Sequence, residues 1–216
     1  MLHRFCPRCG NQEKEDEPFV GTFCRACYLS HESHFSVPDL SLCTCTQCGR
    51  YRLKGFWSKP EELEPFLGGK IRTPHKTESF HADFSEEKNA LSAHVHLRLS
   101  AHGASIPINS TVRIPLERMT CPDCMRASGG YHEAILQVRG DDPKTVESRA
   151  NALIRKLQKK TFISKIERQK NGIDVWIGDQ RVLYELLAGT RFTASRKLSG
   201  ERGGKRLYRS TLCVRV

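Results

Sequence analysis

The chain has 216 residues, a formal net charge of +11, 38% hydrophobic residues and 27% charged residues. This composition excludes a disordered chain, and the lack of any run of about 18 apolar residues excludes a membrane-spanning helix. The first residues, Met1-Leu2-His3-Arg4, lack the apolar core that a signal peptide needs. We therefore expect a cytoplasmic protein of one large domain or two smaller ones, with no membrane partner.

The positive charge is concentrated in one part of the chain. Residues 1–130 carry 16 Lys/Arg and 15 Asp/Glu, a net +1, whereas residues 131–216 carry 19 Lys/Arg and 9 Asp/Glu, a net +10. A solvated, solubilising surface is one explanation of such a charge. An asymmetry this large favours a face that binds a polyanion.

The first 130 residues are predicted to form two segments. Residues 1–57 hold three of the four C-x-x-C pairs and too few apolar residues for a core, so metal is expected to replace packing. Within the second segment, 58–130, three prolines in residues 58–74 predict a loop with at most a helical turn. Alternating patterns from Thr77 to Leu116 then predict antiparallel strands. In these strands Phe80, Ala82 and Phe84 share one face, and Val95, Leu97 and Leu99 oppose His94, His96 and Arg98.

The remaining segment, residues 131–216, alternates strands and helices. Asp142 and Pro143 predict the start of a helix that ends near Lys160. A second helix is predicted over Gln180–Leu187, and strands over Tyr131–Arg139, Phe162–Gln169, Ile173–Ile177, Arg191–Leu198 and Arg206–Val214, the last two around a Gly-rich turn at 199–205. The order βαββαβ with one more strand indicates a basic ferredoxin-like α/β sandwich, so the fold class of the whole chain is α+β.

Eight of the ten cysteines form C-x-x-C pairs, a spacing typical of zinc knuckles and not of disulfides. Two thiolates on one tight turn can both reach a tetrahedral ion. We predict two Zn²⁺ per chain, one held by Cys6, Cys9, Cys24 and Cys27 and the other by Cys45, Cys48, Cys121 and Cys124. An iron–sulfur cluster is the minor alternative. Cys43 is a possible substitute for Cys45, although only Cys45 has the knuckle spacing to Cys48, and Cys213 is expected to be a core thiol.

No catalytic motif accompanies these sites. Sites with four thiolates leave no open position for water or substrate. Residues 200–206 resemble a phosphate-binding loop only superficially, because Ser199 stands where a glycine is needed and Arg206 where Ser or Thr is needed. His94 and His96 share a strand face as two metal ligands would, but no third ligand is evident. His31 and His34 either face RNA or are solvent-exposed or packing residues. We expect no enzymatic activity and no small-molecule substrate.

Seven short motifs follow one another along the chain: C-P-R-C-G at 6–10, C-R-A-C at 24–27, C-T-Q-C-G-R-Y at 45–51, C-P-D-C at 121–124, A-I-L-Q-V-R at 134–139, N-G-I-D-V-W at 171–176 and S-R-K-L at 195–198. With them the chain resembles, over nearly its whole length, archaeal members of the Nmd-three family. Eukaryotic relatives in this family are nuclear export adaptors for the large ribosomal subunit. The resemblance implies a partner, the large ribosomal subunit, bound through ribosomal RNA during late maturation, and a role in keeping the small subunit away.

The resemblance does not carry over nuclear export, because the sequence ends at Val216 without the C-terminal signals and β domains of longer relatives. Two other classes of function stay open: an RNA-processing or RNA-modifying enzyme with a zinc-stabilised recognition domain, and a DNA-binding regulator. The first lacks a candidate nucleophile. The second lacks a helix–turn–helix, and the apolar spacing of the long predicted helix suits a sheet partner.

RNA contacts are expected from two sets of residues. The planar side chains of the knuckles would stack on unpaired bases, and the cations of the C-terminal hairpin would neutralise phosphates. The knuckle set is Arg8, Arg25, Arg50, Tyr51 and Arg52, and the hairpin set is Arg196, Lys197, Arg202, Lys205, Arg206 and Arg209. A further group of cations, Arg155, Lys156, Lys159 and Lys160, either contacts phosphates or only complements the dipole at a helix end.

Overall fold

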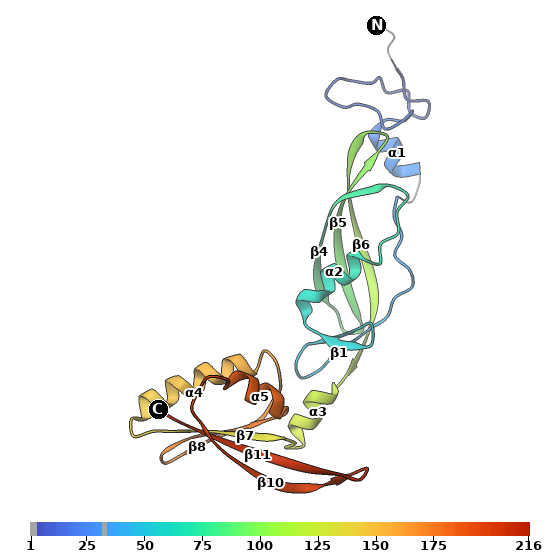
Figure 1. The fold of residues 1–216 in the computed structure, drawn as a ribbon. Coiled ribbons are helices and arrows are strands. Elements are labelled where there is room, and N and C mark those ends of the chain that lie inside the picture. The colour runs from blue at the N-terminus through green and yellow to red at the C-terminus, as the bar shows by residue number, and fades with distance from the viewer. Residues whose placement is uncertain (1–3, 32–33) are drawn as a thin grey trace. The chain divides into compact units, whose positions relative to one another are not determined.

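A computed structural model describes residues 4–31 and 34–216 (Figure 1). The chain divides into two compact units, Met1–Met119 and Thr120–Val216, called here the first and second unit. The division predicted at residue 57 falls inside the first unit, because residues on its two sides share one sheet. In that sheet Leu42 pairs with Leu116 and Cys45 with Met119.

The first unit contains a six-stranded sheet in the order β3-β2-β1-β6-β5-β4. Its strands are β1 (Leu42–Cys45), β2 (Tyr51–Leu53), β3 (Phe56–Ser58), β4 (Lys76–Glu86), β5 (Ala90–Ala101) and β6 (Ala104–Met119), and its helices are α1 (Arg25–His31), η1 (Pro60–Glu62) and α2 (Leu63–Gly68). The two helical pieces after β3 lie in the predicted loop 58–74. There is slightly more helix than predicted because Leu63 and Leu67, spaced by four residues, both bury their side chains.

The predicted alternation in the β region is confirmed. On β5, Val95, Leu97 and Leu99 are buried, whereas His94 and His96 on the opposite face are exposed. Strands β4, β5 and β6 pair antiparallel, as the two-residue periodicity predicts. The buried face forms the main core of the first unit together with Leu42, Tyr51, Leu63 and Leu67.

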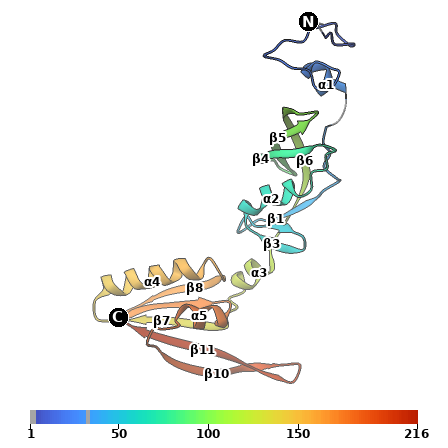
Figure 2. The ribbon, with the colours of Figure 1, turned by 45° about the horizontal axis from the view of Figure 1, so that its top comes forward.

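The second unit begins with α3 (Pro122–Ser128) and continues as an α/β sandwich. Its elements are β7 (Ala134–Arg139), α4 (Pro143–Leu157), β8 (Ile163–Gln169), β9 (Gly172–Ile177), α5 (Gln180–Leu186), β10 (Thr193–Arg202) and β11 (Lys205–Arg215). Helices α4 and α5 lie on the same face of the five-stranded sheet (Figures 1 and 2). The carboxylate of Asp142 accepts hydrogen bonds from the amides of Lys144 and Thr145, and so caps α4 where the sequence predicts it.

The sheet order β10-β11-β7-β9-β8 departs from a ferredoxin-like sheet at one position. Strands β7, β9 and β8 keep the split βαβ arrangement, in which each neighbouring pair is antiparallel. The place beside β7, where the fourth strand of a ferredoxin-like sheet lies, is taken by the additional strand β11, which pairs with β7 in parallel. Strand β10 is therefore displaced to the edge of the sheet, where it pairs with β11.

The hairpin between β10 and β11 is longer than predicted. The sequence predicts a turn over residues 199–205, but the strands continue to Arg202 and resume at Lys205. Only Gly203 and Gly204 form the turn, with φ values of +56° and +75°. Two successive residues with positive φ suit a tight hairpin turn because its twist matches that of the paired strands.

Candidate metal centres and cationic surface

Four cysteines of the first unit form the first thiol group. The sulfur atoms of Cys6, Cys9, Cys24 and Cys27 all lie within 4.8 Å of one another. A tetrahedral ion with bonds of about 2.3 Å to sulfur separates its ligands by about 3.8 Å. The Cys9 and Cys24 sulfur atoms are 3.6 Å apart. The spacing of this group therefore fits a tetrahedral four-thiolate centre.

The second group consists of Cys45, Cys48, Cys121 and Cys124, whose sulfur atoms also lie within 4.8 Å of one another. Cys45 ends β1, and its register partner Met119 ends β6 two residues before Cys121. The strand pairing thus brings two knuckles together that are more than seventy residues apart in the sequence. The two groups are the two sets of four that the sequence predicts.

Each group combines two kinds of turn. In the first kind, the amide of Gly10 donates to the Cys6 carbonyl (2.9 Å), and that of Gly49 donates to the Cys45 carbonyl (3.0 Å). Both glycines have positive φ, +76° and +68°, which explains the glycine that follows each of these C-x-x-C pairs.

The second kind of turn is the start of a helix. Helix α1 begins directly after Cys24, and Cys121 is the N-cap of α3, where its sulfur accepts a hydrogen bond from the Cys124 amide (3.4 Å). Helical amides supply donors to thiolates at these positions. This role of the helices is not among the features predicted from the sequence, although Pro122 in the first turn of α3 is a signal for it.

Two thiols of the first group, Cys6 and Cys27, have pKa values shifted in opposite directions. Burial raises the pKa of Cys6, but the backbone amides of Cys24, Arg8 and Cys9 outweigh it and lower the pKa to about 6. Burial, followed by the neighbouring sulfur atoms, raises the pKa of Cys27 to about 12. Four thiolates therefore do not form together in this group without a cation to offset their repulsion.

The other candidate ligands lie outside these groups. The Cys43 thiol donates to the Glu117 carboxylate (3.5 Å), so Cys45 and not Cys43 is the member of the second group. His34 is buried, stacks on Tyr28 and bonds the Tyr28 carbonyl (3.0 Å), which makes it a packing residue. Among the described residues, neither group of closely spaced metal-ligating side chains includes His94 or His96, whose rings bond Thr111 and Asn109.

The side chain of His31 lies outside the described residues. In the knuckle set, the guanidinium of Arg8 donates to the Ser30 hydroxyl (3.0 Å) and that of Arg25 to the Ser105 carbonyl (2.7 Å). The side chain of Arg52 is exposed, whereas that of Arg50 is half-buried.

Tyr51 is a correction to the predicted set of RNA-binding residues. Its side chain is only 4% exposed, and its hydroxyl donates to the Glu86 carboxylate. The alternation on β2 explains this burial, because Tyr51 and Leu53 point to the core while Arg52 points to solvent. The ring of Tyr51 is therefore unavailable for stacking on a base.

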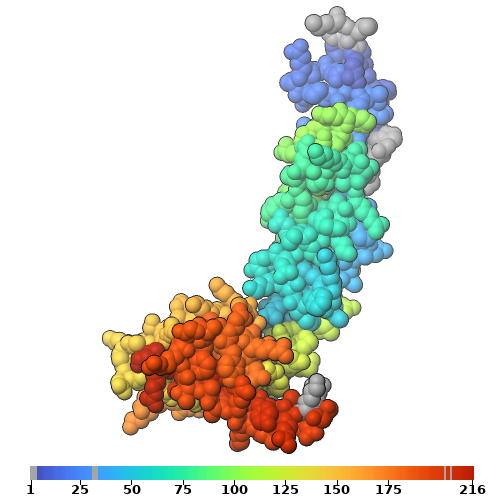
Figure 3. All heavy atoms as spheres, in the orientation of Figure 1, coloured from blue at the N-terminus to red at the C-terminus, as the bar shows by residue number. Residues whose placement is uncertain are grey.

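Cations of the second unit differ in their partners. Lys160, just after α4, is 2.6 Å from Glu185. On the hairpin, Arg196, Lys197, Arg206 and Arg209 have no carboxylate partner among the residues that the structure describes. These four side chains are exposed, and Figure 3 shows part of the hairpin on the face in view. The side chains of Arg202 and Lys205 lie outside the described set. Unpaired surface cations of this kind attract polyanions.

Two family models match the chain. The model described as NMD3, N-terminal domain, matches residues 6–129, and the model described as NMD3, second domain, matches residues 131–216. A comparison with curated proteins found no match. Among the described residues, no helix combines the length and the apolar composition that crossing a bilayer requires.

Proposed function

Because the chain belongs to the NMD3 family, we propose that it binds the large ribosomal subunit through ribosomal RNA and acts as a maturation or subunit anti-association factor. The observation that carries this proposal is the match of two consecutive family domains over nearly the whole chain. The cations of the β10–β11 hairpin, which lack carboxylate partners among the described residues, support it. We place the protein in the cytoplasm.

Zinc is proposed as the ion of both four-cysteine groups. Zinc accepts four thiolates in a tetrahedron and supplies binding energy that a small, poorly packed segment needs in order to fold. Its charge would draw the proton from Cys27, whose pKa is high without it. With four sulfur ligands the ion has no open position, so we propose a structural role for it and no enzymatic activity for the protein.

Sedimentation with purified ribosomal subunits tests the proposed function. The protein is incubated separately with large subunits, small subunits and joined ribosomes, and each mixture is separated on a sucrose gradient. We expect the protein to sediment with free large subunits and to be depleted from the other two fractions. Equal sedimentation with small and large subunits, or with neither, would contradict the proposal.

A second measurement separates binding from processing. Incubation of the protein with deproteinised ribosomal RNA is expected to leave the length and base composition of the RNA unchanged. Cleavage or base modification that a point substitution abolishes would favour an RNA-processing enzyme instead.

A further inference from the structure

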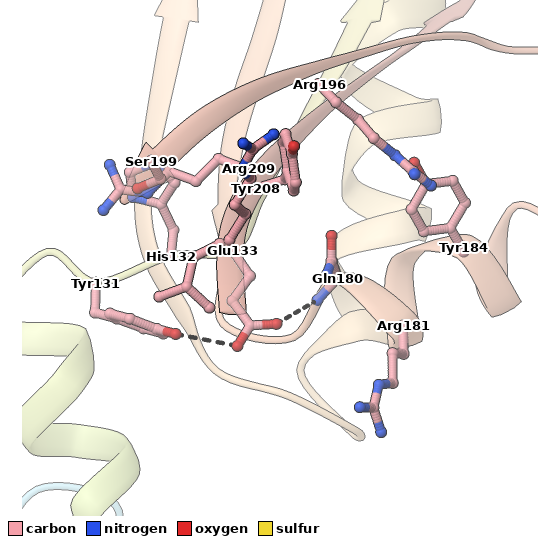
Figure 4. A pocket seen from close by; sticks show the side chains of 12 residues that line it. Tyr131, His132, Glu133, Gln180, Arg181, Tyr184, Arg196, Ser199, Tyr208 and Arg209 are labelled. Atoms are coloured by element: carbon pink, nitrogen blue, oxygen red, sulfur yellow. Dashed lines mark hydrogen bonds between the residues drawn. The ribbon is translucent and has the colours of Figure 1, made fainter. Parts of the chain in front are cut away.

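A cavity of about 510 Å³ lies in the second unit, where the β10–β11 hairpin meets residues 131–133 and the start of α5. Figure 4 shows that its side chains come from these three places and converge on one space. Arginine and tyrosine dominate the lining, and Glu133 is the one carboxylate among the described residues that line it. Volumes of about 300–1,000 Å³ are typical of sites for small organic groups.

The position of the cavity follows from the alternation along β11. Leu212 and Val214 are buried on the helix side of the sheet. One step further out on the same face, the Ser210 hydroxyl donates to the side-chain carbonyl of Gln180 on α5 (3.1 Å). The next residue on that face is Tyr208, which is 44% exposed. The hairpin thus continues past the end of the helix layer, and its helix-side face becomes a wall of the cavity.

The three tyrosine side chains that line the cavity, Tyr131, Tyr184 and Tyr208, differ in their contacts. The hydroxyl of Tyr131 donates to one oxygen of Glu133 (3.0 Å), and the other oxygen accepts from the Gln180 amide (3.3 Å). The guanidinium of Arg196 lies over the Tyr184 ring, 5.9 Å from its centroid. In contrast, no described ring or cation stacks on Tyr208. Tyr208 therefore offers an aromatic face that the described part of the protein does not cover.

The charges at the cavity are unbalanced. Arg181, Arg206 and Arg209 line it without a carboxylate partner among the described residues. The single acid, Glu133, already accepts hydrogen bonds on both oxygens, from Tyr131 and from the start of α5. Guanidinium groups bind phosphate oxygens through two parallel hydrogen bonds, so this excess suits a phosphate group.

We propose that the cavity binds one unpaired nucleotide of an RNA, with the base stacked on Tyr208 and the phosphate at the arginines. An exposed aromatic face beside unpaired guanidinium groups is the pairing that single-stranded nucleic acid uses, because every base has a π face and every nucleotide a phosphate. A base within an intact duplex is stacked on both sides and has no free face for the ring. The inference rests on the proposed RNA-binding function and names the form of RNA that the second unit recognises.

The test uses three RNA hairpins of the same length and charge: one with a single bulged nucleotide, one with an abasic site at the bulge, and one fully paired. Binding is measured by fluorescence anisotropy for the parent, Tyr208→Ala and Tyr208→Phe. Because stacking on one aromatic ring is the interaction removed, we expect Tyr208→Ala to bind the bulged RNA about 5- to 150-fold more weakly. The abasic and paired RNAs should bind parent and variant alike, and Tyr208→Phe should behave as the parent.

A matched control is Phe56→Ala, which removes an aromatic side chain that is 78% exposed on β3, outside the cavity. It is expected to bind all three RNAs as the parent does. Zinc content and circular dichroism confirm that each variant is folded. If Tyr208→Ala binds the bulged RNA as tightly as the parent, or is weakened equally for the bulged and abasic RNAs, the ring stacks on no base and the inference is overturned.

The same variants separate this inference from the proposed function. If the parent sediments with large subunits but Tyr208→Ala shows no weakening that is specific to the bulged base, the cavity inference fails and the function stands. If the bulge-specific weakening occurs but the parent does not sediment with large subunits, the cavity inference stands and the proposed partner is wrong.

Discussion

Cysteine spacing and cysteine geometry agree at the scale of single residues. Each C-x-x-C pair places two sulfur atoms on one turn, and two of these turns are closed by backbone hydrogen bonds from Gly10 and Gly49, which the sequence shows directly after its knuckles. Four thiols within 4.8 Å of one another are unfavourable as four anions, so the geometry of each group fits a bound cation. Each C-x-x-C pair can be predicted from the sequence because it lies on one turn, whereas the second group also depends on the pairing of β1 with β6.

Replacing one ligand is expected to remove one zinc ion. The parent should hold two zinc ions per chain, and Cys24→Ser should hold one, because three thiolates do not complete the tetrahedron. Elemental analysis of the purified proteins provides the measurement. Cys43→Ser and Cys213→Ser are matched controls outside both groups and should retain two ions. One ion or none in the parent, or fewer than two in Cys43→Ser, contradicts this assignment.

The aromatic residues are harder to assign from the sequence than the cysteines. Tyr51 lies between two arginines, which predicts a place on the surface, yet it is buried because its strand alternates toward the core. Tyr208 lies beside Arg209, and its sequence context does not distinguish it from a packing residue, yet it is exposed where the helix layer ends. Exposure of a ring depends on which elements pack over it, and that information is not local.

At the scale of elements, periodicity locates the strands and helices but not their neighbours. The buried residues of α4 follow the apolar spacing of the predicted helix and are Val146, Ala150, Leu153, Ile154 and Leu157. The helix ends at Leu157, three residues before the predicted end near Lys160, and the chain turns at residues 158–160. The insertion of β11 between β7 and β10 is not predictable from periodicity, since either strand of the final hairpin fits beside β7 by its pattern.

A core substitution tests the placement of β11. Leu212 is fully buried under the helices, so Leu212→Ala is expected to lower the free energy of unfolding by about 2–5 kcal/mol. Thr211→Ala, one residue away on the other face, should change it far less. Urea denaturation followed by circular dichroism measures both. A small effect of Leu212→Ala would place β11 at an uncovered edge and contradict the observed sheet order.

The cap of α4 should make stability depend on pH. The Thr145 hydroxyl, followed by the amides of Thr145 and Lys144, lowers the pKa of Asp142 from its usual 3.8. A carboxyl whose pKa is lowered on folding stabilises the fold above its unfolded pKa, and this contribution is lost as the pH falls through the folded value.

We therefore expect the parent to be more stable than Asp142→Asn at pH 7, and the difference to shrink as the pH falls below about 4. Asparagine keeps a capping oxygen without the charge, which makes it the matched control, and any zinc release in acid is common to both proteins. Urea midpoints at each pH provide the measurement. A difference that is constant from about pH 7 to about pH 3 would show that the charge of Asp142 contributes nothing.

At the scale of the whole molecule, the excess charge falls in the second unit, in which some cations have carboxylate partners and others do not. Lys160, Lys165 and Arg168 lie within 2.6–2.7 Å of a glutamate oxygen. The hairpin cations that the structure describes have no such partner. Net charge alone does not distinguish these two groups of cations. The salt dependence of RNA affinity does, because counterions are released only where a cation contacts a phosphate.

The two groups provide a matched pair of triple variants. Lys197→Ala/Arg206→Ala/Arg209→Ala and Lys160→Ala/Lys165→Ala/Arg168→Ala remove the same charge from the same unit. We expect the hairpin variant to bind large subunits more weakly and to flatten the dependence of log affinity on log salt by roughly 0.7–0.9 for each phosphate that the variant no longer neutralises. The second variant should keep a slope close to that of the parent, because its cations are paired with glutamates. Binding is measured by sedimentation over a series of salt concentrations, with zinc content as the check on folding.

Equal weakening in the two variants would show that only net charge matters. Unchanged binding by the hairpin variant would show that its cations serve solubility and that the protein contacts the RNA elsewhere.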